Sequence, residues 1–356
     1  MRILIDALSA PADAGGMRRY AEEVVTAWLD LREAAEDQLI VHGDPWIREV
    51  LAPLDRVTTH VHRLPGRVGR LLDQCVTTAL LGRRYKVDAV LALGPMVTPF
   101  VPRNRRACVV HDWRHRNRPD EFGRAVRAFR RLWVPSIHGA GAVAVISDKT
   151  LEETARFAPR AHPIVVPNGA DHPRRWKASP AFEGTSGYVL TYGHHSNKRP
   201  DLVLRALAHL SATEPRRLIV LGARGAWAQQ LTDLANELNI RHLVDFPGFV
   251  DEEQYQRTIA NAGVLVLAST DEGFGLPVVE GRYFGIPVVA TNDNGLPEIH
   301  PTGVIYCEPT PERLADAIHV AVMQGRGASV EFSGRRWAQT AADLRAMVVS
   351  LLGQRK

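Results

Sequence analysis

The most informative stretch of the sequence is STDEGFGLPVVEGRYFGIPVVA, residues 269–290. It follows the apolar run 263–267, which is too short for a helix and is typical of a buried parallel strand. Pro277 predicts a helix over 277–284, because proline is favoured in the first turn, where N–H groups have no intrahelical partner. A second apolar run at 288–290 completes a strand–helix–strand unit, from which parallel α/β domains are built.

The same alternation of strands and helices fills both halves of the chain. The first half predicts strands at 3–8, 39–41, 89–93, 107–110 and 142–146, with helices at 20–31, 69–81 and 122–134. The second half predicts further strands at 188–192, 217–221 and 244–246, with helices at 201–211, 226–239, 252–261 and 336–352. A segment rich in Pro, Gly and Ser at 173–187 predicts a linker between them. We therefore expect an α/β protein with two Rossmann-like domains, which would face each other across a ligand-binding cleft.

Composition sets limits on the kind of protein. The 356 residues fit two domains, and no apolar run reaches the length of about 18–20 residues that a membrane-spanning helix needs. The apolar run Ile3–Ile5 is followed directly by Asp6, so it is too short for the apolar region of a signal peptide, and none is expected. The three cysteines (75, 108 and 307) are scattered, which argues against a disulfide framework or a zinc site and favours the cytoplasm.

Basic charge is concentrated in the first half. Residues 1–170 hold 25 Lys+Arg against 19 Asp+Glu, whereas the remainder holds 19 against 20. At 122–134 arginines alternate with apolar residues in a basic amphipathic pattern. Two interpretations stay open: a helix packed on the sheet, or a peripheral contact with the inner face of a membrane or with a lipid-linked acceptor. Nothing resembles a nucleic-acid-binding module, and aromatic residues make up only 7% of the chain, so no nucleic acid is expected as a partner.

The loop of the opening stretch has the chemistry of an anion site. Gly273 and Gly275 let the backbone approach a ligand, and the N–H groups at the start of the following helix attract a pyrophosphate. Glu272 precedes the loop and Glu280 lies about one turn into the helix. Two carboxylates beside such a site suit pairs of hydroxyl groups, as carboxylates bind riboses in dinucleotide folds.

Here the chain resembles the retaining glycosyltransferases of GT-B fold, especially family 4. Glu272 and Glu280, with seven residues between them, match the E-x7-E motif of that family. Five other segments match further parts of the family's pattern, and they occur in the same order along the chain: 145–147, 166–171, 248–250, 285–290 and 295–298. The resemblance covers nearly the whole chain. It implies an acceptor-binding domain at 1–173, a nucleotide-sugar-binding domain at 174–335, and a helix at 336–356 that returns to the first domain.

The resemblance also implies roles for individual residues. Glu280 is expected to bind the ribose hydroxyls and Glu272 the hydroxyls of the transferred sugar. Lys198 is expected on the donor phosphates, and His111 on the donor sugar. Further donor contacts are expected from Gly15, Gly16, Arg199, Gly248, Phe249, Val250, Gly273 and the backbone N–H groups of Phe274, Gly275 and Leu276.

The sequence departs from the family pattern at two places. The family usually has an arginine just after the position of Gly193, where this chain has His194 and His195, so Arg199 or a histidine is the candidate for the missing charge. Asn294 stands where the family often has a glycine. Asp112, next to His111, either orients that histidine or caps the following segment.

The implied reaction is the transfer of a hexose, of mannose type or similar, from a GDP- or UDP-linked donor with retention of configuration. The acceptor would be a hydroxyl of a glycan, a glycolipid or a small molecule, as in polysaccharide biosynthesis. The family mechanism is a front-side displacement in which the leaving phosphate accepts the proton of the acceptor. No Asp-x-Asp motif is present, so neither a metal nor a cofactor is expected. The alternatives are a nucleotide-sugar epimerase and a non-catalytic nucleotide-binding protein of the same fold.

Overall fold

The chain forms two compact units. The computed structural model describes residues 1–11, 15–64, 66–178, 187–211, 215–327 and 334–353. Unit 1 comprises Met1–Asp171 together with Gly334–Lys356, and unit 2 comprises His172–Ser333. The expected boundary after residue 173 lies two residues away from this division, and the C-terminal segment belongs to unit 1.

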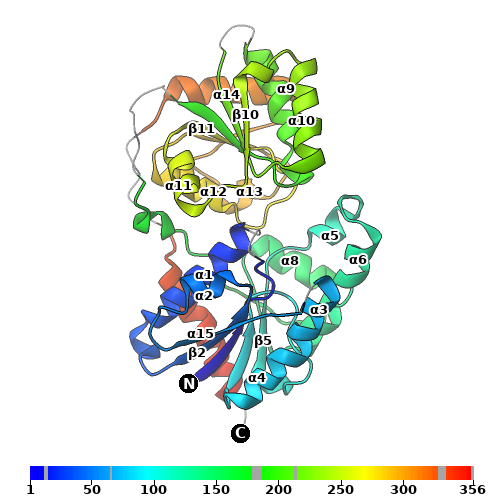
Figure 1. Ribbon diagram of the computed structural model, residues 1–356, viewed down its shortest axis with the longest axis vertical. Helices are drawn as coiled ribbons and strands as arrows, with labels where there is room; N and C mark the ends of the chain where they lie inside the picture. The colour runs from blue at the N-terminus through cyan, green and yellow to red at the C-terminus, as the bar shows by residue number, and fades with distance from the viewer. Residues whose placement is uncertain (12–14, 65, 179–186, 212–214, 328–333, 354–356) are drawn as a thin grey trace. The chain divides into compact units, whose positions relative to one another are not determined.

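Unit 1 is built on a parallel sheet, of which Figure 1 labels β2 and β5. Its seven strands have the order β3-β2-β1-β4-β5-β6-β7. The strands are β1 (Arg2–Asp6), β2 (Gln38–Gly43), β3 (Val57–Val61), β4 (Ala89–Ala92), β5 (Arg106–Val110), β6 (Ala142–Val145) and β7 (Ile164–Val165). The helices include α1 (Gly15–Leu29), α2 (Trp46–Val50), α3 (Gly66–Leu72), α4 (Thr78–Arg84), α5 (Arg114–Asn117), α6 (Arg124–Arg130), α7 (Trp133–Gly139), α8 (Asp148–Phe157) and α15 (Trp337–Gly353). The strand order reverses between β1 and β4, as in a doubly wound fold.

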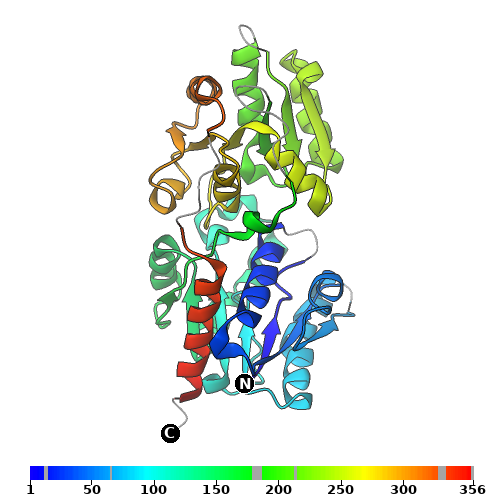
Figure 2. The ribbon, with the colours of Figure 1, turned by 90° about the vertical axis from the view of Figure 1, so that its left-hand side faces the viewer.

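Helix α15 packs beside α1 and completes unit 1 (Figure 2). The apolar positions that predicted this helix are all buried: Trp337, Ala341, Leu344, Met347, Val348 and Leu351. The indole of Trp337 meets the ring of Tyr20 edge-on at 5.7 Å between centroids. Halfway along α15, Arg345 Nε donates to Asp37 Oδ2 at 2.8 Å.

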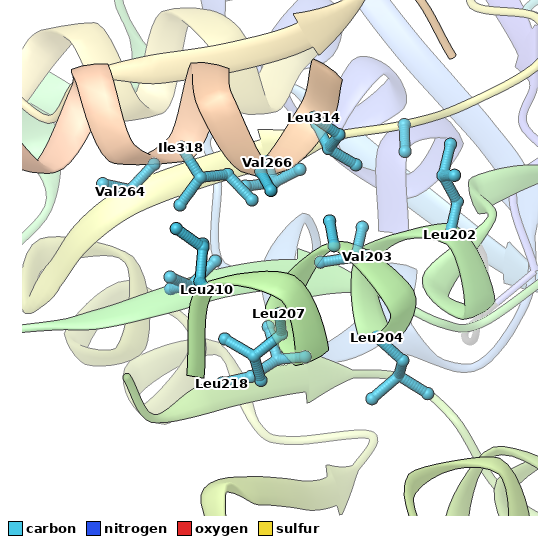
Figure 3. Close-up of a cluster of buried hydrophobic side chains, with 14 of the residues drawn as sticks. Leu202, Val203, Leu204, Leu207, Leu210, Leu218, Val264, Val266, Leu314 and Ile318 are labelled. Atoms are coloured by element: carbon cyan, nitrogen blue, oxygen red, sulfur yellow. The ribbon is translucent and has the colours of Figure 1, made fainter. Parts of the chain in front are cut away.

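Unit 2 contains a parallel sheet of six strands in the order β10-β9-β8-β11-β12-β13. The strands are β8 (Tyr188–Tyr192), β9 (Leu218–Leu221), β10 (Val244–Gly248), β11 (Ala262–Leu267), β12 (Val288–Thr291) and β13 (Ile305–Cys307). The helices are α9 (Pro200–Ser211), α10 (Gly225–Glu237), α11 (Glu252–Ala260), α12 (Leu276–Tyr283), α13 (Leu296–Ile299) and α14 (Pro311–Gln324). Figure 3 shows the core on one face of this sheet, where leucines of α9 meet Leu314 and Ile318 of α14. The sequence predicted every strand of this sheet except β13 and missed α14.

The predicted helix 122–134 is in fact two helices. It ends as α6 at Arg130, and α7 begins at Trp133. Pro135 explains the interruption, because proline inside a continuous helix would lack an N–H and clash with the carbonyl group of residue 131. Placed in the first turn of α7, it needs no partner.

The predicted helix 69–81 is longer than expected. It runs from Gly66 to Arg84 as α3, a π-helical segment η2 (Asp73–Thr77) and α4. In unit 1 the sequence missed β3 and β7. The linker predicted at 173–187 begins with a short helix, η5 (His172–Arg175), and its residues 179–186 lie outside the described part of the chain.

None of the described helices combines the length and the apolar character needed to cross a membrane.

Candidate functional site

Lys198 and Glu272 meet at the point where the strand order of unit 2 reverses. Lys198 ends the short helix η6 (Ser196–Lys198) after β8, and Glu272 follows β11, the neighbouring strand. Lys198 Nζ donates a hydrogen bond to Glu272 Oε1, and both side chains are mostly buried. Doubly wound sheets bind ligands at this reversal point, beyond the carboxyl ends of the strands. The fold therefore joins two residues that are 74 positions apart and that were both expected at the site.

The glycine loop before α12 has a conformation that requires glycine. Gly275 has a φ of +78° and precedes the first residue of α12. A Cβ atom at this position would lie 2.5 Å from Leu296 Cδ2. His300 Nε2 donates to the carbonyl oxygen of Phe274 at 2.8 Å and fixes the loop from the other side.

Three backbone donors of this loop are available to a ligand. Within the described part of the chain, the N–H groups of Phe274, Gly275 and Leu276 pair with no acceptor. Such groups at the start of a helix attract an anion, and the helix dipole adds to the effect. The loop therefore presents these backbone donors two to four residues after Glu272, which contacts Lys198.

Glu280 lies in the interior of unit 2 with only 2% of its surface exposed. His172 Nε2 contacts one carboxylate oxygen, Oε1, at 2.9 Å, and the Tyr255 hydroxyl donates to Oε2 at 2.7 Å. The hydroxyl of Tyr192 lies 3.2 Å from that of Tyr255. Burial, reinforced by the negative charge of Glu280, raises the pKa of both tyrosines well above the usual range. The tyrosines are therefore neutral hydrogen-bond donors at any physiological pH.

Sequence reasoning did not identify His172 and Tyr255 as partners of Glu280. His172 is 108 positions away from the carboxylate, and no local pattern links the two. The only available signal was that His172 directly follows the matched segment 166–171.

Arg199 makes several contacts within unit 2. Its backbone is left-handed, with a φ of +46°, and its guanidinium binds Asp293 through two hydrogen bonds of 2.7 and 3.0 Å. The same guanidinium donates to Thr291 Oγ1 at 2.8 Å and to the carbonyl oxygens of Ala268 and Ser269. All these partners lie at the ends of β11 and β12, so the side chain ties loops together and its donors are already engaged.

The histidines that replace the usual arginine lie beside the β9–α10 loop. His194 packs against Gly222, whose φ is +84°, and its ring lies 5.0 Å from that of His195. Trp227 Nε1 donates to the carbonyl oxygen of Gly193 at 2.9 Å. Besides Arg199, which is engaged elsewhere, His194, His195 and Lys198 are the basic residues that follow β8 in the chain before α9.

Asn294 compensates for the glycine it replaces. Its Oδ1 atom accepts the N–H of Leu296 at 3.0 Å, and its backbone carbonyl accepts the N–H of Glu272 at 3.0 Å. The next residue, Gly295, provides the left-handed turn with a φ of +84°. The side chain of Asn294 thus supports the start of α13, and the bond to Glu272 comes from the backbone, which a glycine would also provide.

The expected base-contacting turn lies at the carboxyl end of β10. Gly248 has a φ of +73°, and its carbonyl oxygen accepts the N–H of Gly222 at 2.8 Å. Phe249 is 45% exposed, and the Arg224 guanidinium lies 4.2 Å from the centre of its ring. Val250 packs on the core of unit 2. The turn thus presents an aromatic ring and a cation at the surface.

His111 directly follows β5 in unit 1. Its Nε2 atom donates to the carbonyl oxygen of Leu93 at 3.0 Å, and Tyr20 meets its ring edge-on at 4.6 Å. Burial lowers the pKa of His111, so the ring is neutral at neutral pH. Asp112 does not orient this histidine; its Oδ1 atom accepts the N–H of Arg114 at 3.0 Å and caps the next segment.

Gly15 and Gly16 were predicted in a loop but form the first two residues of α1. Both are exposed, and a Cβ atom at either position would meet nothing within 4 Å. Their place at a helix start after β1 is compatible with an approaching anion, but no close backbone contact explains why glycine stands there.

Comparison with known proteins relates the sequence of unit 2 to a described family. The family model for glycosyl transferases group 1 matches residues 174–326, nearly the whole of unit 2. D-inositol 3-phosphate glycosyltransferase from Mycobacteroides abscessus is 35% identical over 158 residues, which make up 41% of this chain and 35% of that protein. The match thus spans about a third of the length of that relative.

Solved structures resemble the chain over its whole length. Sucrose-phosphate synthase from Thermosynechococcus elongatus has a TM-score of 0.72 at 17% identity, covering 99% of this chain and 95% of that one. Anabaena HepE, solved in complex with UDP-glucose, has a TM-score of 0.69 at 17% identity, with coverage of 99% and 98%. At this level of identity the likeness concerns the fold, and it confirms the predicted GT-B fold with two parallel-sheet α/β domains.

Proposed function

We propose that this chain, whose unit 2 matches the family model for glycosyl transferases group 1, transfers a hexose from a nucleoside-diphosphate sugar to an acceptor hydroxyl. The observation that carries the proposal is the meeting of Lys198 and Glu272 beside the N-terminus of α12, at the reversal point of the sheet. A cation, backbone donors and a carboxylate in one place suit the phosphates and the sugar of such a donor.

Lys198 and the loop would carry the electrostatic part of the reaction. When the bond between sugar and phosphate breaks, negative charge grows on the leaving phosphate. The N–H groups of Phe274, Gly275 and Leu276, together with the ammonium of Lys198, would stabilise that charge without reorganisation. The leaving phosphate would accept the proton of the attacking hydroxyl. Because attack and departure then occur on one face of the sugar, the anomeric configuration would be retained.

Glu272 and His111 would orient the sugar. In the absence of a donor, Glu272 is paired with Lys198, so a bound donor would exchange this contact for contacts to phosphate and to sugar hydroxyls. Since Nε2 of His111 donates to Leu93, its neutral ring leaves Nδ1 as an acceptor. His111 would therefore accept a hydrogen bond from a sugar hydroxyl rather than supply a positive charge.

The finer features of the proposal follow from the family resemblance. The donor would be GDP- or UDP-linked, the hexose of mannose type or similar, and the reaction independent of metal and cofactor. The acceptor would be a glycan, a glycolipid or a small molecule, in cytoplasmic polysaccharide biosynthesis. An epimerase would convert the donor without any acceptor, and a non-catalytic protein would bind nucleotide without turnover.

We also propose that unit 1 contacts anionic membrane lipid, although not through residues 122–134. There arginine covers two of the three aromatic rings, since the Arg130 guanidinium lies 4.6 Å from the ring centre of Phe122 and 4.7 Å from that of Trp133. The large exposed apolar side chains of unit 1 concentrate instead along α3–η2–α4. We call the following four the apolar stripe: Val68 (73% exposed), Leu72 (49%), Val76 (40%) and Leu80 (55%).

The geometry of α3–η2–α4 keeps the apolar stripe on one side. In a pure α-helix, two side chains four residues apart differ in direction by about 40° around the helix axis. The π-helical segment η2 turns less per residue and reduces this drift. Exposed arginines lie at both ends of the helix, at Arg63 and at Arg83–Arg84, and its acidic residue Asp73 is buried. An apolar face bordered by positive charge suits an anionic lipid surface.

The donor test is calorimetric titration of GDP, UDP, dTDP and ADP, without metal, into the wild type and into Glu280→Ala. Micromolar binding of one nucleotide, weakened at least tenfold by the substitution, is expected. A matching nucleotide sugar should then be consumed only when an acceptor is present. Failure of a folded wild type to bind any nucleotide would refute the proposed function, and donor conversion without an acceptor would favour the epimerase.

A further inference from the structure

The carboxylate of Glu280 is held at both oxygens by residues of unit 2. His172 Nε2 lies 2.9 Å from Oε1, and the Tyr255 hydroxyl donates to Oε2 at 2.7 Å. His172 comes from η5 and Tyr255 from α11, so two separate elements approach the carboxylate from different sides. The side chains of His172 and Glu280 are 0% and 3% exposed, which makes this one of the most deeply buried contacts between titratable groups in the described residues.

Aromatic rings surround this contact. Trp176 meets His172 edge-on at 5.7 Å and Tyr255 at 6.0 Å between ring centres, and it stacks on Phe284 at 5.8 Å. A carboxylate in such surroundings is costly unless hydrogen-bond donors compensate for the lost water. His172 and Tyr255 provide this compensation, and together they also determine how the carboxylate plane is rotated.

Because the rotation of the Glu280 carboxylate is fixed, the directions of its remaining hydrogen-bond acceptor sites are fixed as well. A carboxylate offers about four lone-pair sites, two on each oxygen. The contacts with His172 and Tyr255 use one on each oxygen, so one further site on each oxygen keeps a fixed direction. Two acceptors side by side match two neighbouring hydroxyl groups, such as O2′ and O3′ of a ribose.

We propose that His172 is a positioning residue that holds Glu280 ready for both ribose hydroxyls, so that the chain takes ribonucleoside-diphosphate sugars and rejects 2′-deoxy donors such as dTDP-sugars. This inference rests on the proposed function, because it takes Glu280 as the residue that contacts the ribose. A donor without the 2′ hydroxyl would leave one oriented acceptor of a buried carboxylate unpaired. Such a loss is more costly than the loss of a hydrogen bond at the surface.

The test compares ribonucleotides with their 2′-deoxy counterparts. UDP against 2′-deoxy-UDP, and GDP against 2′-deoxy-GDP, are titrated calorimetrically into the wild type and four variants. The variants are His172→Phe, His172→Gln, Glu280→Ala and the control His209→Gln. His209 pairs with Glu312 at 3.5 Å on the exposed surface of unit 2, so the control removes a His–Glu contact away from the site. Melting curves establish that each variant is folded.

The wild type is expected to prefer the ribonucleotide by about tenfold to hundredfold, the range for one hydrogen bond to a charged group. Glu280→Ala should abolish the preference, and His172→Phe should reduce it to about threefold or less. His172→Gln, which keeps a side-chain donor, should retain more of the preference than His172→Phe. The control should match the wild type. A fifth variant, which combines His172→Phe with Glu280→Ala, should show the same ratio as Glu280→Ala alone.

A preference that is unchanged in folded His172→Phe would overturn the inference and leave the proposed function intact. A wild type that binds 2′-deoxy-UDP as well as UDP, while Glu280→Ala weakens both, would also overturn it. If folded wild type binds no nucleotide, the proposed function itself fails. The preference ratio distinguishes positioning from general packing, because a merely structural loss would weaken both nucleotides equally.

Discussion

Replacing Gly275 by alanine should damage both the stability and the anion site of unit 2. The left-handed backbone at this position costs a residue with a Cβ atom about 1–2 kcal/mol. The new methyl group would lie 2.5 Å from Leu296 Cδ2, and the adjustment of a packed side chain adds about 1–2 kcal/mol. The total is about 2–4 kcal/mol, which corresponds to a fall of about 5–15 °C in the melting temperature of a domain of this size.

The same substitution should weaken nucleotide binding. Relief of the clash moves the N–H groups of Phe274, Gly275 and Leu276, so the affinity for the preferred nucleoside diphosphate should fall about tenfold. Gly16→Ala is the matched control for the melting temperature, because Gly16 also lies at a helix start but has open space around it. The control should melt at or slightly above the wild-type temperature, since alanine is the better helix former.

Calorimetric melting and titration of both variants measure these effects. A Gly275→Ala protein that melts within 1 °C of the wild type, as roughly the error of such a scan, would refute the conformational argument. An equal fall of the melting temperature in Gly16→Ala would show that the effect does not come from the geometry of the glycine loop.

Three further predictions concern separate parts of the molecule. Lys198→Met should keep the melting temperature of the wild type but lose at least about tenfold in nucleotide affinity. Arg199→Met should melt at a lower temperature, because Asp293 and two carbonyl oxygens lose their donor. Calorimetry measures both effects, and a reversed pattern would contradict the assigned roles. Burial raises the pKa of Asp6 to about 7, so its ionisation destabilises unit 1 as pH rises from the unfolded value of about 4 through 7. Asp6→Asn should therefore stabilise the protein more at pH 8.5 than at pH 4.5 in melting curves, and an equal offset at both pH values would count against a buried carboxylate. Leu72→Glu with Leu80→Glu should abolish sedimentation with anionic liposomes, while Met323→Glu on the exposed face of α14 should not; no sedimentation of the wild type would end the membrane proposal.

The sequence was sufficient to predict the strands that are buried on both faces. Runs such as 188–192 and 288–290 are continuously apolar, and the structure places β8 and β12 there. Strand β3 was not predicted, because it forms the edge of its sheet and its residues Thr58, Thr59 and His60 do not form an apolar run. Helix α14 was missed although Thr310, which caps it, and Pro311 in its first turn are ordinary helix-start signals.

The site was predictable where a local motif defines it and unpredictable where distant segments meet. Glu272, Gly275 and Glu280 lie within one loop and one helix, so their spacing already indicates a shared site. Lys198 and Arg199 are adjacent cations, and only the left-handed backbone of Arg199 directs its side chain to Asp293. His172 reaches Glu280 through the folding of unit 2, which no sequence period encodes.

The division of unit 1 into two sequence segments bears on how the chain matures during synthesis. Residues 1–171 leave the ribosome first, yet the helix that covers α1 follows only after the 162 residues of His172–Ser333. Until then Tyr20 lacks its neighbour Trp337, and Asp37 lacks the cation of Arg345. Unit 2 can close its own core in the meantime, because it is continuous in sequence. The nascent first unit therefore waits with an uncovered apolar surface, which makes it the part of the chain most in need of chaperone protection.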